Sequence, residues 1–197
     1  MKNIRYSMVL FVLLAKSGYS QAPPKKELYN KEFNWKITIP ENFENVSVVD
    51  WAKLQNRGKE AIEKTYDAEM VDHTTTIFVF RADQFNYFEA NCQPFDISID
   101  GDYLESFKEV NQVLFNTFKA QIPNVVLDSL SSDEIVDGFK FNKFKVIVNF
   151  PNKVIMDFTM YSRLFNKKEF TVNIMTVDKE KRKMLFDAWR NSNFGRK

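Results

Sequence analysis

The chain has 197 residues, with 20 phenylalanines, five glycines and a single cysteine, a length that suits one domain. Its 28 basic and 26 acidic side chains almost cancel, which argues against a nucleic-acid-binding protein, because such proteins normally carry a clustered positive face. One cysteine cannot form an internal disulfide, so an apolar core must hold the fold together.

Residues 1–20 have the layout of a secretory signal peptide. Cations precede an apolar run over residues 8–15, and small residues follow it. The run is shorter than the roughly 20 residues that a transmembrane helix needs. We therefore expect cleavage before Gln21 and export to the periplasm or the exterior, with no transmembrane segment in the mature chain. The signal peptide contains three cations, Lys2, Arg5 and Lys16. Their removal leaves 25 basic and 26 acidic residues in the mature chain.

The first half of the remaining chain alternates between strands and helices. Residues 33–39 alternate apolar and polar side chains, which predicts a half-buried strand. Apolar residues spaced by three and four predict a helix over residues 47–66, with Ser47 as its cap. Two extended segments are predicted over residues 74–80 and 85–95, because both are rich in β-branched and aromatic residues.

The second half is mostly extended. A helical stripe over residues 103–120 precedes an antiparallel meander of about four strands, in which short turns connect long runs. The apolar positions change parity within the first long run, so we expect a bulge or bend near Asn142 and Lys143. The chain closes with a helix that Asp178 caps.

This order of elements predicts an α+β fold. Three amphipathic helices need an apolar surface to cover, and we expect an α/β/α sandwich around a central, mainly antiparallel sheet of about six strands. The single domain is expected to span residues 33–194. A flexible tail is expected over residues 21–32 and a short one over residues 195–197.

Three segments together resemble the PsbP-like family. They are an opening strand that ends in proline, "FNWKITIP", the late antiparallel meander, and the closing strand and helix, "KKEFTVNIMTVDKEKRKMLFDAWRNSNF". That family includes the extrinsic photosystem II subunit, a Ran-binding nuclear import factor and bacterial envelope proteins of the DcrB type. The resemblance covers residues 33–194 as an order of elements. It implies the α/β/α sandwich and accessory or binding work, and it transfers no site residue.

The segment "DISIDGDYLESF" resembles a calcium loop in the spacing of its aspartates around Gly101. A loop that starts at Asp96 needs a bidentate glutamate at its twelfth position, where this chain has Phe107. We favour a helix start instead, in which Asp102 is the cap and residues 97–99 form a short edge strand. We therefore predict no metal site here.

Nucleophilic catalysis has little material in this chain. His73 and Cys92 are the only residues of their types, and they could pair only if they met in space. Cys92 alternates with Phe88 and Ala90, which predicts a buried and unreactive thiol. One histidine and one cysteine do not make a zinc site, and the isolated glycines form no phosphate loop. We predict no catalytic residue and no cofactor.

A group of basic residues near the C-terminus is the best electrostatic candidate for a site. It is interpreted as an anionic docking patch, a surface that binds an anionic partner, and the alternative is a solvated helix face. The basic residues are Lys167, Lys168, Lys179, Lys181, Arg182 and Lys183. We predict a non-enzymatic binding or accessory module of the bacterial envelope or exterior. Its partner would be an unknown protein or envelope component, and not a nucleic acid. The alternatives are a small secreted hydrolase that uses carboxylates, and a carrier of an apolar ligand in a cavity lined by Phe158, Met160 and Met175.

Overall fold

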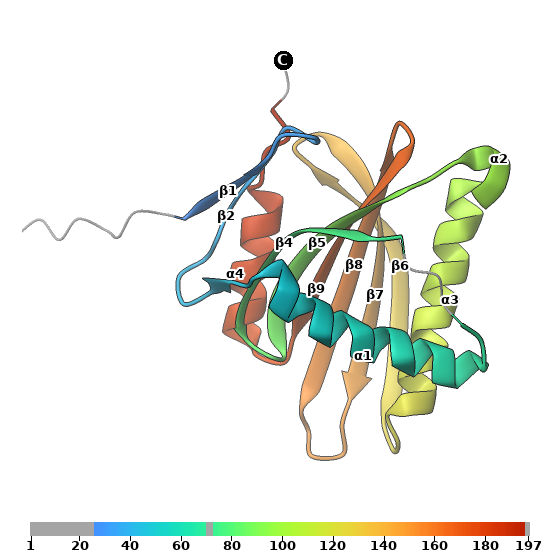
Figure 1. Cartoon of the computed structure of the whole chain (residues 1–197). Helices are drawn as coiled ribbons and strands as arrows, with labels where there is room; N and C mark the ends of the chain where they lie inside the picture. Colours follow the sequence, from blue (N-terminus) through green and yellow to red (C-terminus); the bar gives the residue numbers. More distant parts are fainter. Residues whose placement is uncertain (1–25, 70–72, 196–197) are drawn as a thin grey trace, which may run out of the picture.

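The computed structural model describes residues 26–69 and 73–195, so the predicted signal peptide lies outside the described part of the chain. A seven-stranded sheet forms the centre of the fold (Figure 1), and each neighbouring pair of strands in it is antiparallel. In spatial order the strands are β3 (Glu44–Asn45), β4 (Thr75–Asp83), β5 (Asn86–Pro94), β9 (Lys168–Thr176), β8 (Ile155–Phe165), β7 (Phe139–Asn149) and β6 (Val126–Val136).

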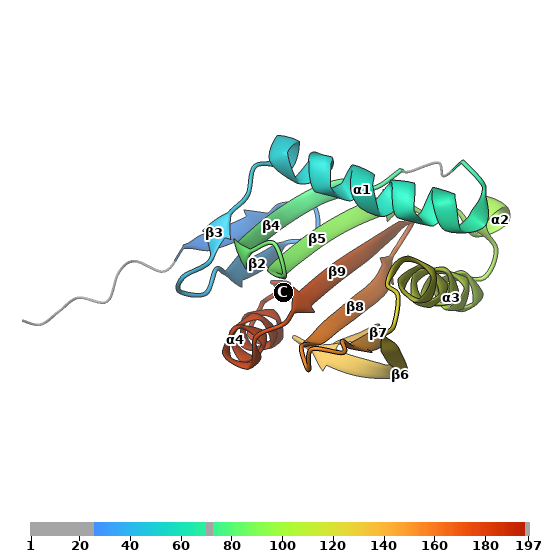
Figure 2. The ribbon, with the colours of Figure 1, turned by 90° about the horizontal axis from the view of Figure 1, so that it is seen from below.

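Helices cover both faces of this sheet. The described residues form α1 (Val48–Tyr66), α2 (Ile97–Asp100), α3 (Tyr103–Gln121), α4 (Lys179–Arg190) and a hairpin of β1 (Glu27–Asn30) with β2 (Trp35–Thr38). Figure 2 shows α1 and α3 on one face and α4 on the other. The predicted α+β class and its mainly antiparallel sheet are confirmed, although the sheet has seven strands rather than about six. Among the described helices, none is both long and apolar enough to cross a membrane.

The two faces of the sheet bury two separate apolar cores. The larger core lies between the sheet, the β1–β2 hairpin and α4, and it is dense in aromatic rings. The ring of Trp35 lies 5.1 Å from that of Phe170, and the ring of Trp189 lies 5.0 Å from that of Phe141. The smaller core lies beneath α3, where the ring of Phe118 packs edge-on at 5.7 Å from that of Phe158.

Strand β7 contributes to both cores, and this corrects the predicted bulge near Asn142 and Lys143. Phe141 packs in the larger core and Phe144 in the smaller one, while the register of β7 against β6 runs unbroken from residue 139 to residue 149. The change of parity therefore reflects burial on alternate faces of one regular strand. The register shifts lie in β4 instead.

The hairpin corrects the expected tail over residues 21–32. Residues 27–30 of that segment form β1 and pair with β2, and Leu28 packs against the larger core. The strand predicted over residues 33–39 therefore lies in this hairpin and not in the central sheet. Its alternating burial is real, because Trp35 and Ile37 face the sheet and Lys36 faces solvent.

The segment before α3 corrects the expected edge strand over residues 97–99. It forms the single turn of α2, because the Asp96 side chain accepts a hydrogen bond from the backbone N–H of Ser98 at 3.0 Å. The predicted cap of α3 is confirmed, since Asp102 accepts from the backbone N–H groups of Leu104 and Glu105 at 2.9 and 3.1 Å.

Candidate functional site

A groove of about 330 Å³ lies between α4 and strands β7 and β8, and most of its lining is charged. Its lining residues are Lys143, Lys145, Asp157, Thr159, Lys179, Arg182, Lys183, Phe186, Asp187 and Arg190. Six of these are cations and two are carboxylates. A concave surface with an excess of one charge focuses its electrostatic potential, so the groove favours an anionic group.

Asp157 fixes two of the cations at the floor of the groove. This β8 residue is only 2% exposed, and its carboxylate forms ion pairs with Lys145 Nζ at 2.7 Å and Arg182 Nη1 at 3.1 Å. The Thr159 hydroxyl adds a further bond at 3.0 Å. Two cations on one carboxylate leave a local excess of positive charge whose position is fixed before any ligand arrives.

Glu134 lies outside the lining of the groove, joins β6 to α4 and holds two of the cations that line it. Its carboxylate accepts hydrogen bonds from Lys143 Nζ at 2.6 Å, Arg190 Nε at 2.8 Å and the Tyr161 hydroxyl at 3.0 Å. Burial opposes ionisation of this carboxyl, but the hydrogen bonds and charges of Lys143 and Arg190 outweigh it and lower the pKa of Glu134. The same two cations lie over the ring of Phe186, 6.0 and 5.5 Å from its centre.

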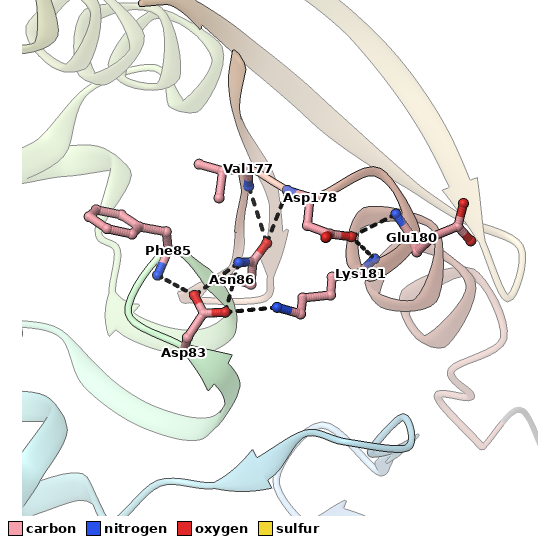
Figure 3. A network of polar contacts seen from close by, with 7 residues as sticks. All are labelled: Asp83, Phe85, Asn86, Val177, Asp178, Glu180 and Lys181. Atoms are coloured by element: carbon pink, nitrogen blue, oxygen red, sulfur yellow. Dashed lines mark hydrogen bonds and ion pairs between the residues drawn. The ribbon is translucent and has the colours of Figure 1, made fainter. Parts of the chain in front are cut away.

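A polar network between two segments far apart in the sequence positions the first turn of α4 (Figure 3). Asn86, at the start of β5, is 2% exposed, and its side-chain oxygen accepts from the backbone N–H groups of Val177 and Asp178 at 3.1 and 3.3 Å. Asp178 then caps α4 by accepting from the backbone N–H of Lys181 at 2.9 Å. The Lys181 ammonium pairs with Asp83 at 2.9 Å. The β4–β5 turn thereby anchors the helix that carries the groove.

The structure divides the six cations of the predicted docking patch between three places. Lys179, Arg182 and Lys183 line the groove, whereas Lys181 belongs to the anchoring network. Another two, Lys167 and Lys168, lie at the other end of β9, about 30 Å away at roughly 3.3 Å per strand residue. Lys168 forms an ion pair with Glu32 of the β1–β2 turn.

Sequence reasoning missed the other three cations of the groove. Lys143 and Lys145 occupy alternate positions of β7 and so share one face of the sheet. Arg190 follows Arg182 and Phe186 at intervals of four along α4, which places all three on one side of the helix. The spacing within each element was visible in the sequence, but the packing of β7 beside α4 was not.

Glu89 is a second buried acid, and it serves a different purpose. It is 6% exposed, and its carboxylate accepts hydrogen bonds from Trp51 Nε1 and Gln55 Nε2, both at 2.7 Å, and from Asn173 Nδ2 at 3.3 Å. Burial raises the pKa of Glu89. A raised pKa in a cleft is typical of a catalytic acid, but α1 covers this side chain, so Glu89 fastens α1 to the sheet.

The other candidates from the sequence occupy separate environments. Cys92 is buried in the larger core, where burial raises the pKa of its thiol, and His73 is exposed. Phe158, Met160 and Met175 lie together in the smaller core beneath α3, where Phe118 packs on Phe158. Within the described ranges, no group of three or more histidine, cysteine or acidic residues could hold a metal ion.

Comparisons with known proteins identify the fold alone. No family model and no curated protein sequence matches the chain. Among solved structures, the solution structure of cyanobacterial PsbP (CyanoP) from Synechocystis sp. PCC 6803 is similar, with a TM-score of 0.53 and 12% sequence identity. The match covers 89% of this chain and 95% of that one. The chain therefore has a PsbP-like fold.

Proposed function

We propose that this chain is an exported, non-enzymatic binding or accessory module. Its groove beside α4 binds an anionic group of a partner protein in the bacterial envelope or outside the cell. The PsbP-like fold supports accessory work through the resemblance described above. The DcrB-type envelope proteins, which the same resemblance includes, supply the expected cellular setting.

One observation carries this proposal: six cations line the groove against two carboxylates. Asp157 and Glu134 fix four of the cations in place. A ligand therefore meets a site that needs little rearrangement, which lowers the cost of binding. Phe186 adds an aromatic wall between the two ends of the groove.

The test uses a fluorescently labelled hexaglutamate peptide and its anisotropy at low ionic strength. We expect Lys179→Glu with Lys183→Glu to weaken binding by about tenfold or more, because this reverses two charges of the groove. Arg182 is left in place, since it pairs with the buried Asp157.

The matched control makes the same charge change at the opposite end of the molecule, at Lys31 and Lys167, both exposed. Binding by the control should stay within about twofold of the wild type, apart from long-range screening effects. An equal loss in both double variants would show that the peptide senses net charge rather than the groove, and would refute the proposed site.

Export is a separate part of the proposal and has its own test. The full chain, expressed in a bacterium with a functioning secretion system, should yield a mature protein that begins at Gln21. N-terminal sequencing of the secreted or periplasmic fraction checks the cleavage position. A full-length chain that stays in the cytoplasm would contradict export while leaving the groove untouched.

A further inference from the structure

On the α4 side, the half of strands β6 and β7 that includes residues 126–132 lacks a covering layer in the described part of the chain, whereas Val136 and Phe141 at the other end of the two strands are buried in the larger core. Helix α4 packs on β9, β5 and β2 and contacts the covered end of β6 and β7 through the pairs Arg190–Glu134 and Trp189–Phe141, and Figure 2 shows α4 to one side of these two strands. The opposite face of the same strands is covered by α3. Two strands span about 10 Å at roughly 4.8 Å each, which is about the diameter of one α-helix.

Apolar side chains lie on this open surface, which we call the β6–β7 face. Leu130 pairs with Lys145, and Val126 pairs through Asn149 with Ile155, so these residues share the face that carries the groove. Their side chains are strongly exposed: Val126 69%, Leu130 63% and Ile155 47%. Ile147, which lies between Asp128 and Asp157 in the register, is half-buried.

The charges around the β6–β7 face are asymmetric. On its inner side lies the groove, with Lys145, Lys179 and Arg182. Asp128 of β6 is exposed and lies between Val126 and Leu130 on the same face of that strand. An occupant therefore meets positive charge along the flank nearest α4, and beneath it the apolar side chains of β6 with the Asp128 carboxylate between them.

We propose that an amphipathic α-helix of the partner protein docks on the β6–β7 face, parallel to the strands and beside α4. This inference rests on the proposed function, because the acidic flank of that helix would occupy the groove. Its apolar stripe would cover Val126, Leu130 and Ile155, and a neutral or basic side chain of the helix would face Asp128 between Val126 and Leu130. From Val126 to Ser132 the face is about 20 Å long, which matches about 14 helical residues.

The probe is a labelled synthetic peptide of 14 residues. It has leucines at positions 1, 4, 5, 8, 11 and 12, which form one stripe on a helix, glutamates along one flank only, and alanine or serine elsewhere. A scrambled peptide of the same composition keeps the charge and breaks the stripe. We expect the striped peptide to bind about tenfold more tightly than the scrambled one, and to gain helical circular dichroism on binding.

The double variant Leu130→Ser with Val126→Ser should remove this tenfold difference. It leaves the charge of the groove unchanged, so hexaglutamate should bind as it does to the wild type. The control double variant, Ile97→Ser with Ile99→Ser, removes two side chains that are 70% and 83% exposed on α2. It should retain the full difference between the two peptides.

Four results would overturn the inference. Equal binding of the striped and scrambled peptides would show that the groove reads charge alone, and the proposed function would stand. A gain of strand signal on binding would identify an added strand along β6 instead. A wild-type dimer in sedimentation, dissociated by the Leu130 and Val126 double variant, would assign the face to a second copy of this chain. Failure of hexaglutamate to bind would remove the proposed function together with the inference.

Discussion

Two buried carboxylates show how neighbouring side chains decide the role of an acid. Asp157 contacts two cations, whereas Glu89 contacts only neutral donors among the hydrogen bonds described above. Neutral donors offset the cost of burying a carboxylate only in part. Asp157 therefore holds two cations of the groove in place, whereas ionisation of Glu89 destabilises the folded protein.

Replacing Glu89 with glutamine should remove a pH dependence of stability. The pKa of Glu89 is raised in the folded protein by burial, so its contribution is fully present below the unfolded pKa of about 4.5 and is lost as pH rises through the folded pKa. The free energy of unfolding of Glu89→Gln, minus that of the wild type, should therefore increase from about pH 4.5 upward. Urea denaturation of both proteins between pH 4 and pH 8 measures this difference. A difference that is flat with pH would contradict the raised pKa.

The glutamine variant should also fold well, because the site can satisfy it. Its carbonyl can keep the bonds from Trp51 and Gln55. Its amide can donate to Asn173 Oδ1, a buried atom that has no hydrogen-bond partner, once the Asn173 amide turns over. Glu89→Ala instead leaves donors of Trp51, Gln55 and Asn173 without an acceptor, and should lower the free energy of unfolding by about 1–3 kcal/mol.

At the scale of single elements, local signals in the sequence predicted the helix starts well. Ser47, Asp102 and Asp178 each cap the helix expected after them, because a cap depends on the two or three residues that follow it. Ile97 and Ile99 failed as a strand signal for the same reason. The Asp96 side chain accepts a hydrogen bond from the backbone N–H of Ser98, which favours a turn. In the described part of the chain, no strand pairs with residues 97–99.

The cap of α3 gives a prediction that separates it from a calcium loop. Asp102→Ala should lower the free energy of unfolding by about 1 kcal/mol, because two backbone N–H groups lose their acceptor. Addition of millimolar Ca²⁺ should leave the thermal unfolding midpoint of the wild type unchanged relative to EDTA. A rise in the midpoint with Ca²⁺ that disappears in Asp100→Ala would restore the calcium interpretation, because Asp100 would be a side-chain ligand at position 5 of that loop, whereas Asp102 would contribute only its backbone carbonyl.

The junction between β9 and α4 depends on Asn86, which no local signal identified. Its oxygen reaches two backbone N–H groups more than 90 positions away, and such a contact becomes visible only in the folded chain. Asn86→Ala should lower the free energy of unfolding by about 1–3 kcal/mol. Gln84→Ala, an exposed neighbour in the same turn, should change it by less than about 0.5 kcal/mol. Similar losses in the two variants would show that the turn, and not the Asn86 side chain, anchors α4.

At the scale of the whole molecule, the sequence predicted the class of fold but not which elements cover each face of the sheet. Burial on both faces of β7 looked like a bulge, because Phe141 and Phe144 have opposite parity whether a strand shifts register or is covered on two sides. The hairpin was hidden for a similar reason, since Trp35 and Ile37 show the same alternation in a covering hairpin as in a central strand. The groove depends on this layer assignment, and half of its cations were therefore missed.

Two aromatic cores without a cross-link imply that Cys92 reports on the unfolding of the larger one. Cys92 packs there against the strands and the hairpin, and burial raises the pKa of its thiol, so both access and thiolate formation require the core to open. Labelling by a thiol reagent such as DTNB should be slow in native buffer and should accelerate as urea is added. This acceleration should parallel the change in tryptophan fluorescence on unfolding, since Trp35 and Trp189 share that core. The unfolding midpoint should be the same with and without a reductant, because no disulfide constrains the chain. Fast labelling under native conditions, with the fluorescence of the folded state intact, would mean that the hairpin opens independently and that the two covering layers do not unfold as one unit.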